Sequence, residues 1–170
     1  MLAPITEIFC DIDDFCNTWF MTHSQRVLPN PKRIRYKACR MAASELMTIM
    51  ILFHLSHYRT CKDFYLQCVQ LDMKSYFPNL ISYNRFVEVI SSCFTPLTAY
   101  LMTRLGKPTG LYYVDSSALK VCHNRRINRH RVFDGIATRG KTSVDWFFGF
   151  KLHIVVNHLG ELVNFCVTRG

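Results

Sequence analysis

The sequence GLYYVDSSALKVC, residues 110–122, lies where the character of this chain changes and decides its fold. It follows GKPTG, residues 106–110, whose two glycines and one proline interrupt the preceding helical patterns. Apolar, aromatic and β-branched residues are then frequent over residues 111–121, as is typical of a β-strand. We therefore expect a strand here, and one carboxylate, Asp115, lies inside it.

Two further strands are expected downstream, in GKTSVDWFFGFKLHIVVNHLGELVNFCVTRG, residues 140–170. Residues 146–157 form the longer strand, HLG forms a turn, and residues 161–168 close an antiparallel hairpin. Strand alternation puts one apolar face in the core, made of Phe148, Phe150, Leu152, Ile154 and Val156. Lys151 and His153 lie on the other face. If the sheet is mixed and Asp115 lies on a neighbouring strand, Asp115, Lys151 and His153 could share one surface. The alternative is that Lys151 and His153 belong to a solvated face of the sheet.

The first 105 residues carry helical periodicity instead. Thr60-Cys-Lys-Asp63 is typical of a helix start, and apolar residues recur at helical spacing in several stretches. The expected helices cover residues 5–20, 44–55, 61–71, 83–94 and 97–105. Residues 21–44 hold six cations, two prolines and no acid, which predicts a basic loop. The predicted fold class is α+β, with an all-helical unit at 1–105 followed by three antiparallel strands in 106–170.

Composition and charge limit the classes of protein to which the chain can belong. Of its 170 residues 49% are apolar, which excludes global disorder and indicates a globular protein. The formal net charge is +9, divided into +3 for residues 1–105 and +6 for residues 106–170. Such a surplus of cations favours phosphate backbones or anionic surfaces as partners.

The cysteines and the hydropathy pattern favour a cytoplasmic location. Eight cysteines occur without a C-x-x-C pair, and the N-terminus has no signal-peptide pattern, so we expect reduced thiols. The longest apolar run, Leu46–Leu55, is about half of the ~20 residues that a membrane helix needs. We interpret it as a buried core helix and expect no membrane partner.

A strongly basic segment spans residues 120–141. It contains seven Lys and Arg residues against one acid, Asp134, which favours contact with phosphates over the alternative of a solvated loop. Cys122, His123 and His130 suggest zinc, but structural zinc takes paired ligands and a second pair is missing. The candidate DNA-binding residues are Lys120, Arg125, Arg126, Arg129, Arg131, Arg139 and Lys141, together with Lys151 and His153.

Asp115 is the candidate for chemistry. Two-metal phosphoryl transfer needs carboxylates, because Mg²⁺ prefers hard oxygen ligands, and one carboxylate cannot hold two metals. An acid inside an apolar strand is also costly unless a positive group lies beside it. The alternative is that Asp115, followed by two serines, belongs to a turn or a cap.

Four segments resemble bacterial insertion-sequence transposases of the DDE class. YYVDSSALKVCHNRR (112–126) and RVFDGIATRGKTSVDWFFGFKLHIVVNHLGELVNFCVTRG (131–170) look like the start of their catalytic domain. FHLSHYRTCKDFY (53–65) and FPNLISYNRFVEV (77–89) resemble their N-terminal part. Together these segments extend the resemblance over essentially the whole chain.

The resemblance implies an RNase H-like fold with Asp115 on its first strand as the first metal-ligand carboxylate. It implies Mg²⁺ or Mn²⁺ as cofactor and strand cleavage followed by strand transfer as the reaction. Double-stranded DNA, namely the terminal inverted repeats and a target, is the expected partner, and a homo-oligomer is possible. Residues 1–105 would bind the DNA ends, and Lys151 and His153 would lie near donor DNA.

The sequence departs from the family pattern in two places. Asp145 stands where the family block has glycine, which predicts an altered bend. The second Asp and the Glu of the triad have no counterpart in residues 1–170, so we expect an N-terminal portion of a transposase, inactive alone and without tight metal binding. The alternatives are a non-catalytic DNA-binding regulator of transposition and a non-functional remnant.

Overall fold

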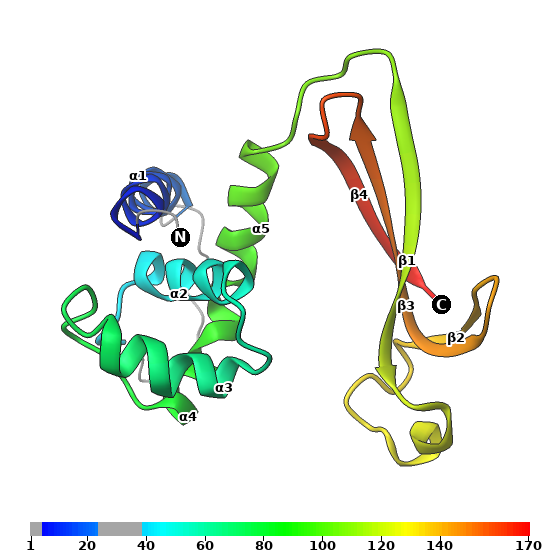
Figure 1. The fold of residues 1–170 in the computed structure, drawn as a ribbon, viewed down its shortest axis with the longest axis horizontal. Coiled ribbons are helices and arrows are strands. Elements are labelled where there is room, and N and C mark those ends of the chain that lie inside the picture. Colours follow the sequence, from blue (N-terminus) through cyan, green and yellow to red (C-terminus); the bar gives the residue numbers. More distant parts are fainter. Residues whose placement is uncertain (1–4, 24–38) are drawn as a thin grey trace, which may run out of the picture. The chain divides into compact units, whose positions relative to one another are not determined.

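The computed structural model describes residues 5–23 and 39–170 (Figure 1). The chain separates into two compact units, Met1–Thr103 and Arg104–Gly170, which are described one at a time. Most of the predicted basic loop at 21–44 lies outside the described residues. The described parts are helices followed by an antiparallel sheet, so the α+β prediction is confirmed.

The N-terminal unit is helical. Its α2 holds the long apolar run of the sequence, and Leu46, Met47, Ile49 and Leu52 are buried, as expected for a core helix. The elements of this unit are α1 (Ile5–His23), α2 (Ala43–Leu55), α3 (Cys61–Asp63), the π-helical η2 (Phe64–Asp72), α4 (Tyr83–Ile90), the 3₁₀ turn η3 (Ser91–Cys93) and α5 (Phe94–Thr103).

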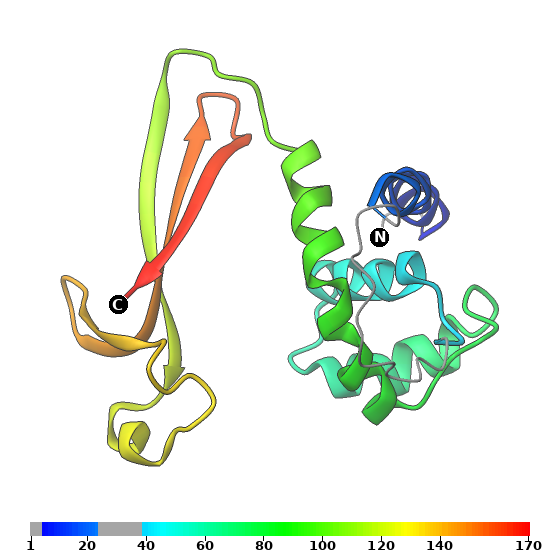
Figure 2. The same ribbon diagram turned by 180° about the vertical axis from the view of Figure 1, so that it is seen from behind.

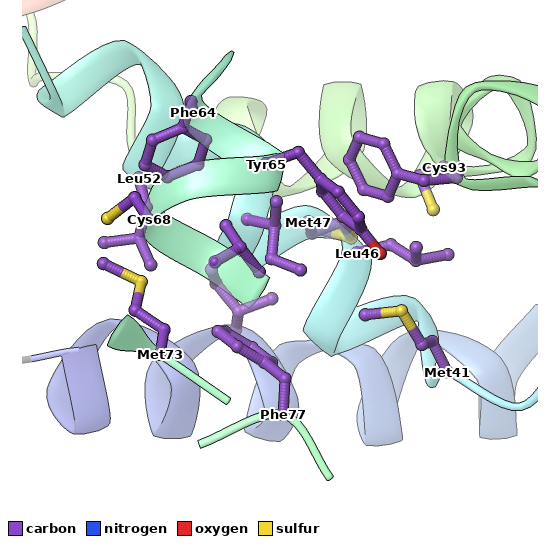
Figure 3. Packing of buried hydrophobic residues seen from close by; sticks show 14 of the residues in the cluster. Met41, Leu46, Met47, Leu52, Phe64, Tyr65, Cys68, Met73, Phe77 and Cys93 are labelled. Atoms are coloured by element: carbon purple, nitrogen blue, oxygen red, sulfur yellow. The ribbon is translucent and has the colours of Figure 1, made fainter. Parts of the chain in front are cut away.

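The core of this unit forms between α1, α2 and η2. Residues of α2 pack with Phe64, Tyr65 and Cys68 of η2, as Figure 3 shows, and α1 adds Ile12 and Cys16. The predicted start of α3 is confirmed, since Thr60 Oγ1 accepts a hydrogen bond from the Asp63 amide at 3.1 Å. This core therefore depends on apolar residues that recur at helical spacing.

The two helices expected at residues 83–94 and 97–105 divide earlier in the structure, because the 3₁₀ turn η3 at Ser91–Cys93 separates α4 from α5. Helical structure is continuous from Tyr83 to Thr103, and Pro96 lies buried in the first turn of α5, where its missing N–H is tolerated. Within the described residues this stretch meets the length and composition of a membrane span. One such stretch is weak evidence, because core helices of soluble proteins also meet those criteria.

The C-terminal unit is an antiparallel sheet of four strands in the described residues. They are β1 (Tyr112–Cys122), β2 (Thr138–Lys141), β3 (Trp146–Asn157) and β4 (Leu162–Arg169). Figures 1 and 2 show β3 between β1 and β4 from opposite sides. One edge of β3 pairs with β1. Along its other edge, the start of β3 pairs with β2 and the remainder pairs with β4. The short β2 lies in a segment that the sequence predicted as loop.

Strand register separates residues that we expected on one surface. Asp115 lies opposite Ile154, whereas Ser116 lies opposite His153 and Ala118 opposite Lys151. Directly opposed residues of an antiparallel pair project from the same face. Asp115 is therefore on the face of Ile154, and Lys151 and His153 are on the other face. The shared surface required a mixed sheet, and the sheet is antiparallel throughout.

The expectation that the Phe148–Val156 face is core is also wrong. These five side chains are only partly buried, whereas Phe147, from the opposite face, is 2% exposed. The segment after η4 (Asn124–Arg129) covers only one end of the face, where the Phe133 ring lies 5.5 Å from that of Phe150. Over the remainder, no other described layer of this unit packs on the apolar side chains.

Two residues hold the strands in register. Gly149 is necessary because a Cβ there would lie 2.0 Å from the Leu119 carbonyl oxygen, next to the irregularity between Lys120 and Cys122. Asn157 is buried and organises the β3–β4 turn: its Oδ1 accepts from the amides of Leu159 and Glu161 at 3.0 and 2.9 Å. Gly149 therefore allows the close approach of β1 and β3, and Asn157 orders the turn between β3 and β4.

Candidate functional site

Asp115 lies inside β1, so the interpretation as a turn or cap residue is wrong. Its side chain is exposed, and Oδ1 accepts a hydrogen bond from the Ser116 amide at 2.7 Å. No ion pair joins it to any cation of the described residues. Solvent hydrates this carboxylate, so the positive neighbour that we expected is not required. The position leaves the second oxygen available for an external ligand.

The residues around Asp115 do not complete a metal site. Across residues 5–23 and 39–170, no three His, Cys, Asp or Glu side chains come close enough together to hold a metal ion. Asp115 can supply one carboxylate, while two-metal chemistry needs several hard oxygen ligands. The described residues therefore do not fit a complete magnesium site. The same observation argues against zinc at Cys122, His123 and His130.

The basic segment contains two ordered elements, η4 and β2, and turns connect them. Arg125, Arg126 and Arg129 lie on the 3₁₀ helix η4, which His123 caps by accepting the Arg125 amide at 3.3 Å. Arg139 and Lys141 lie on β2. Lys120 is near the end of β1 and Arg131 follows η4, and all of the segment's Lys and Arg residues are exposed.

The register assigns the strand-borne cations to two faces. Arg139 pairs with Phe148 and Lys141 with Trp146, so both share the face of Asp115. Lys120 pairs with Gly149 and belongs to the opposite face, together with Lys151 and His153. There His153 Nε2 lies 3.1 Å from Thr168 Oγ1. Asp115 therefore shares a face with Arg139 and Lys141, at positions six and eight residues apart along β3, and Lys151 and His153 belong to the other face.

Two residues of this region, Asn124 and Trp146, were not among the predicted site residues. With Arg139 they line a pocket of about 340 Å³, and the Asn124 amide donates to the Trp146 carbonyl at 2.8 Å. The ammonium of Lys141 lies 5.7 Å from the centre of the Trp146 ring, in a cation–π arrangement. The sequence feature that could have identified Trp146 is its position just after the basic segment, because an aromatic side chain next to cations is typical of nucleic-acid contact.

The turn before β3 accommodates Asp145 without backbone strain. Thr142 Oγ1 accepts the Asp145 amide at 3.0 Å, and the Thr142 amide donates to the Asp145 carbonyl at 2.9 Å. No described residue other than glycine has a positive φ, so this turn does not need glycine at position 145. Asp145 Oδ1 also accepts the Trp146 amide at 2.7 Å, which orders the start of the strand.

Comparison with known families connects this geometry to a class of protein. Residues 105–170, nearly the whole C-terminal unit, match the family model described as transposase DDE domain. No curated protein and no solved structure matched the chain. The matched segment contains Asp115, the basic segment and all four strands. Residues 105–170 therefore form a transposase DDE domain, which supports a DDE-class transposase.

Proposed function

We propose that this chain binds DNA in the cytoplasm as part of insertion-sequence transposition. The observation that carries the proposal is the shared face of Asp115, Arg139 and Lys141 in a transposase DDE domain. Exposed cations attract the DNA backbone, and the Trp146 ring beside Lys141 offers a surface for a base. The element's terminal inverted repeats are the proposed ligand, with target DNA as a second one.

Asp115 is proposed as the first metal-ligand carboxylate of the reaction. Its exposure and its place inside β1 support this role, because the side chain has no structural partner beyond the adjacent Ser116 amide. Transposases of this family generally use divalent metal ions, which stabilise the attacking and leaving oxygens of phosphoryl transfer. The described residues offer one carboxylate, so we propose that residues 1–170 alone bind DNA without cleaving it.

The N-terminal unit is proposed to bind the DNA ends. This assignment rests on the resemblance of residues 53–65 and 77–89 to the N-terminal part of these transposases. The same unit buries its own apolar core, which makes it suitable as a separate binding module. A homo-oligomer on paired DNA ends is part of the same proposal.

The test is the salt dependence of binding to a fluorescently labelled terminal-repeat duplex. Each neutralised phosphate contributes about −0.9 to the slope of log K against log salt concentration. The Arg139→Gln, Lys141→Gln double variant should make that slope less steep by about 1.8. The matched control, Lys107→Gln with Lys120→Gln, removes two charges from exposed positions of the same unit, with Lys120 on the opposite face of the sheet, and should leave the slope unchanged. Equal slopes for both double variants would contradict the proposed face.

A second candidate function is a non-catalytic regulator that competes with an active transposase for the DNA ends. The absence of a three-ligand metal cluster in the described residues favours it. A cleavage assay with Mg²⁺ or Mn²⁺ on terminal-repeat DNA separates the two candidates, with an active transposase of the same element added in one arm. Inhibition of that transposase without intrinsic cutting supports the regulator. Robust cutting by residues 1–170 alone would contradict both the regulator and the proposed need for further carboxylates.

A further inference from the structure

A stripe of basic side chains lies along η4. A 3₁₀ helix has three residues per turn, so residues three apart are stacked on the same face. The N-cap residue His123 and the helical residues Arg126 and Arg129 have this spacing. Arg125 is one residue out of step and projects from another face. The 3₁₀ geometry aligns these residues directly, whereas an α-helix would rotate each by about 60° from the one before it.

The stripe borders a pocket of about 260 Å³. Val121 and Cys122, at the end of β1, and His130 complete its lining. Two aromatic rings surround His130: Phe133 is stacked at 6.0 Å and Phe148 packs edge-on at 6.4 Å. The His130 amide donates to the Ile127 carbonyl at 3.0 Å, which ties this ring to η4. These contacts hold His130 beside η4.

The charge of this pocket is uncompensated within the part of the chain that the structure describes. No described carboxylate forms an ion pair with Arg126 or Arg129, and His130 Nε2 is buried without a hydrogen-bond partner. Two guanidinium groups at one pocket repel a metal cation and attract an anion. Guanidinium forks match the oxygens of a phosphate group geometrically, and histidine can donate to the same oxygens.

We propose that the pocket formed by His123, Arg126, Arg129 and His130 binds one phosphate group of the DNA backbone. This assignment deepens the proposed DNA-binding function and rests on it. Both arginines contact the same phosphate, whereas Arg139 and Lys141 contact separate ones. The pocket positions the DNA without reading its sequence, because phosphate contacts carry no base information.

The experiment combines two probes on the full chain. Inorganic phosphate is titrated while the arginine Nε–H signals are followed by NMR, and a labelled terminal-repeat duplex is titrated at several salt concentrations. Phosphate should shift the signals of Arg126 and Arg129. Arg126→Gln or Arg129→Gln should weaken phosphate binding about tenfold, as expected for the loss of a charged hydrogen bond. Arg125→Gln removes the same charge from another face of η4 and should retain the affinity for inorganic phosphate.

The DNA arm tests whether the phosphate belongs to the backbone. The Arg126→Gln, Arg129→Gln double variant should lower the magnitude of the salt slope by about 0.9, since both residues share one phosphate. A change of about 1.8 would mean two separate contacts and overturn the shared pocket. An unchanged slope with lost phosphate binding would assign the pocket to free phosphate. If DNA binds but inorganic phosphate leaves the Arg126 and Arg129 signals unchanged, the phosphate pocket is also overturned. If the wild-type chain does not bind DNA, the proposed function itself is refuted.

Discussion

Replacing Gly149 by alanine should destabilise the sheet unit more than any glycine-to-alanine change at an open turn. The added Cβ would lie 2.0 Å from the Leu119 carbonyl oxygen and 3.1 Å from the Val121 amide nitrogen. A Cβ atom essentially never lies within 3.0 Å of another heavy atom to which it is not bonded. The backbones of β1 and β3 must therefore separate by at least about 1 Å at this point. That shift disturbs the pairing of Lys120 with Gly149 and of Leu119 with Phe150.

The magnitude follows from two contributions. The positive φ of 155° at Gly149 disfavours any side chain, and a left-handed conformation costs about 1–2 kcal/mol. Overpacking against backbone adds about 1–3 kcal/mol, so we expect a total loss of about 3 kcal/mol in the free energy of unfolding. Gly160→Ala is the matched control, since Gly160 has a φ of 83° but no atom within 4 Å of its Cβ position. It should cost about 1 kcal/mol.

The assay is denaturant unfolding followed by Trp146 fluorescence in a Trp19→Phe background. Trp146 begins β3, so its emission reports on the sheet unit, whereas Trp19 belongs to α1. Separate detection matters because two units need not unfold in one transition. Equal unfolding free energies for the Gly149→Ala and Gly160→Ala variants would refute the reasoning that the close approach of β1 requires glycine.

Three further predictions concern individual side chains. Burial raises the pKa of Tyr65 to about 12 and that of Cys16 to about 11. Both groups therefore contribute stability below about pH 9 that is lost as the pH rises toward 12. The free energy of unfolding, measured against pH, should show this decline, and the decline should be smaller in the Tyr65→Phe variant. Asn157→Ala leaves the amides of Leu159 and Glu161 without their partner and should cost about 2–3 kcal/mol in denaturant unfolding, against under about 0.5 kcal/mol for exposed Asn164→Ala. Asp115→Asn should leave the unfolding free energy within about 0.5 kcal/mol of wild type, because the side chain is exposed; a larger loss would give Asp115 a structural role.

Local sequence patterns predicted the helices and strands whose own apolar residues recur at helical or strand spacing. The apolar run of α2 and the alternation of β3 follow from helical and strand periodicity, and the structure contains both elements. The four residues of β2, Thr138–Lys141, have no apolar alternation. They become a strand because the first residues of β3 offer a free edge for pairing. Such a strand depends on a partner distant in sequence, which a local pattern does not contain.

The candidate site was predictable residue by residue but not in its arrangement. Asp115 and the basic segment stood out by composition, while their faces depend on the register of β1 and β2 against β3. A shift of one residue in that register would move Asp115 to the face of Lys151 and His153. Likewise, the alignment of the stripe on η4 depends on the 3₁₀ geometry, because an α-helix would rotate residues three apart by about 60° from one another.

Trp146 fluorescence during a DNA titration tests the proposed binding face most directly. The ring lies beside Lys141 on the face of Asp115 and is 56% exposed, so DNA bound there must contact or shield it. In the Trp19→Phe background, terminal-repeat DNA should change the emission with the same midpoint as the anisotropy of the labelled DNA. High salt should abolish both signals. Saturating anisotropy with unchanged Trp146 emission would show that DNA binds elsewhere, and would contradict the assignment of this face.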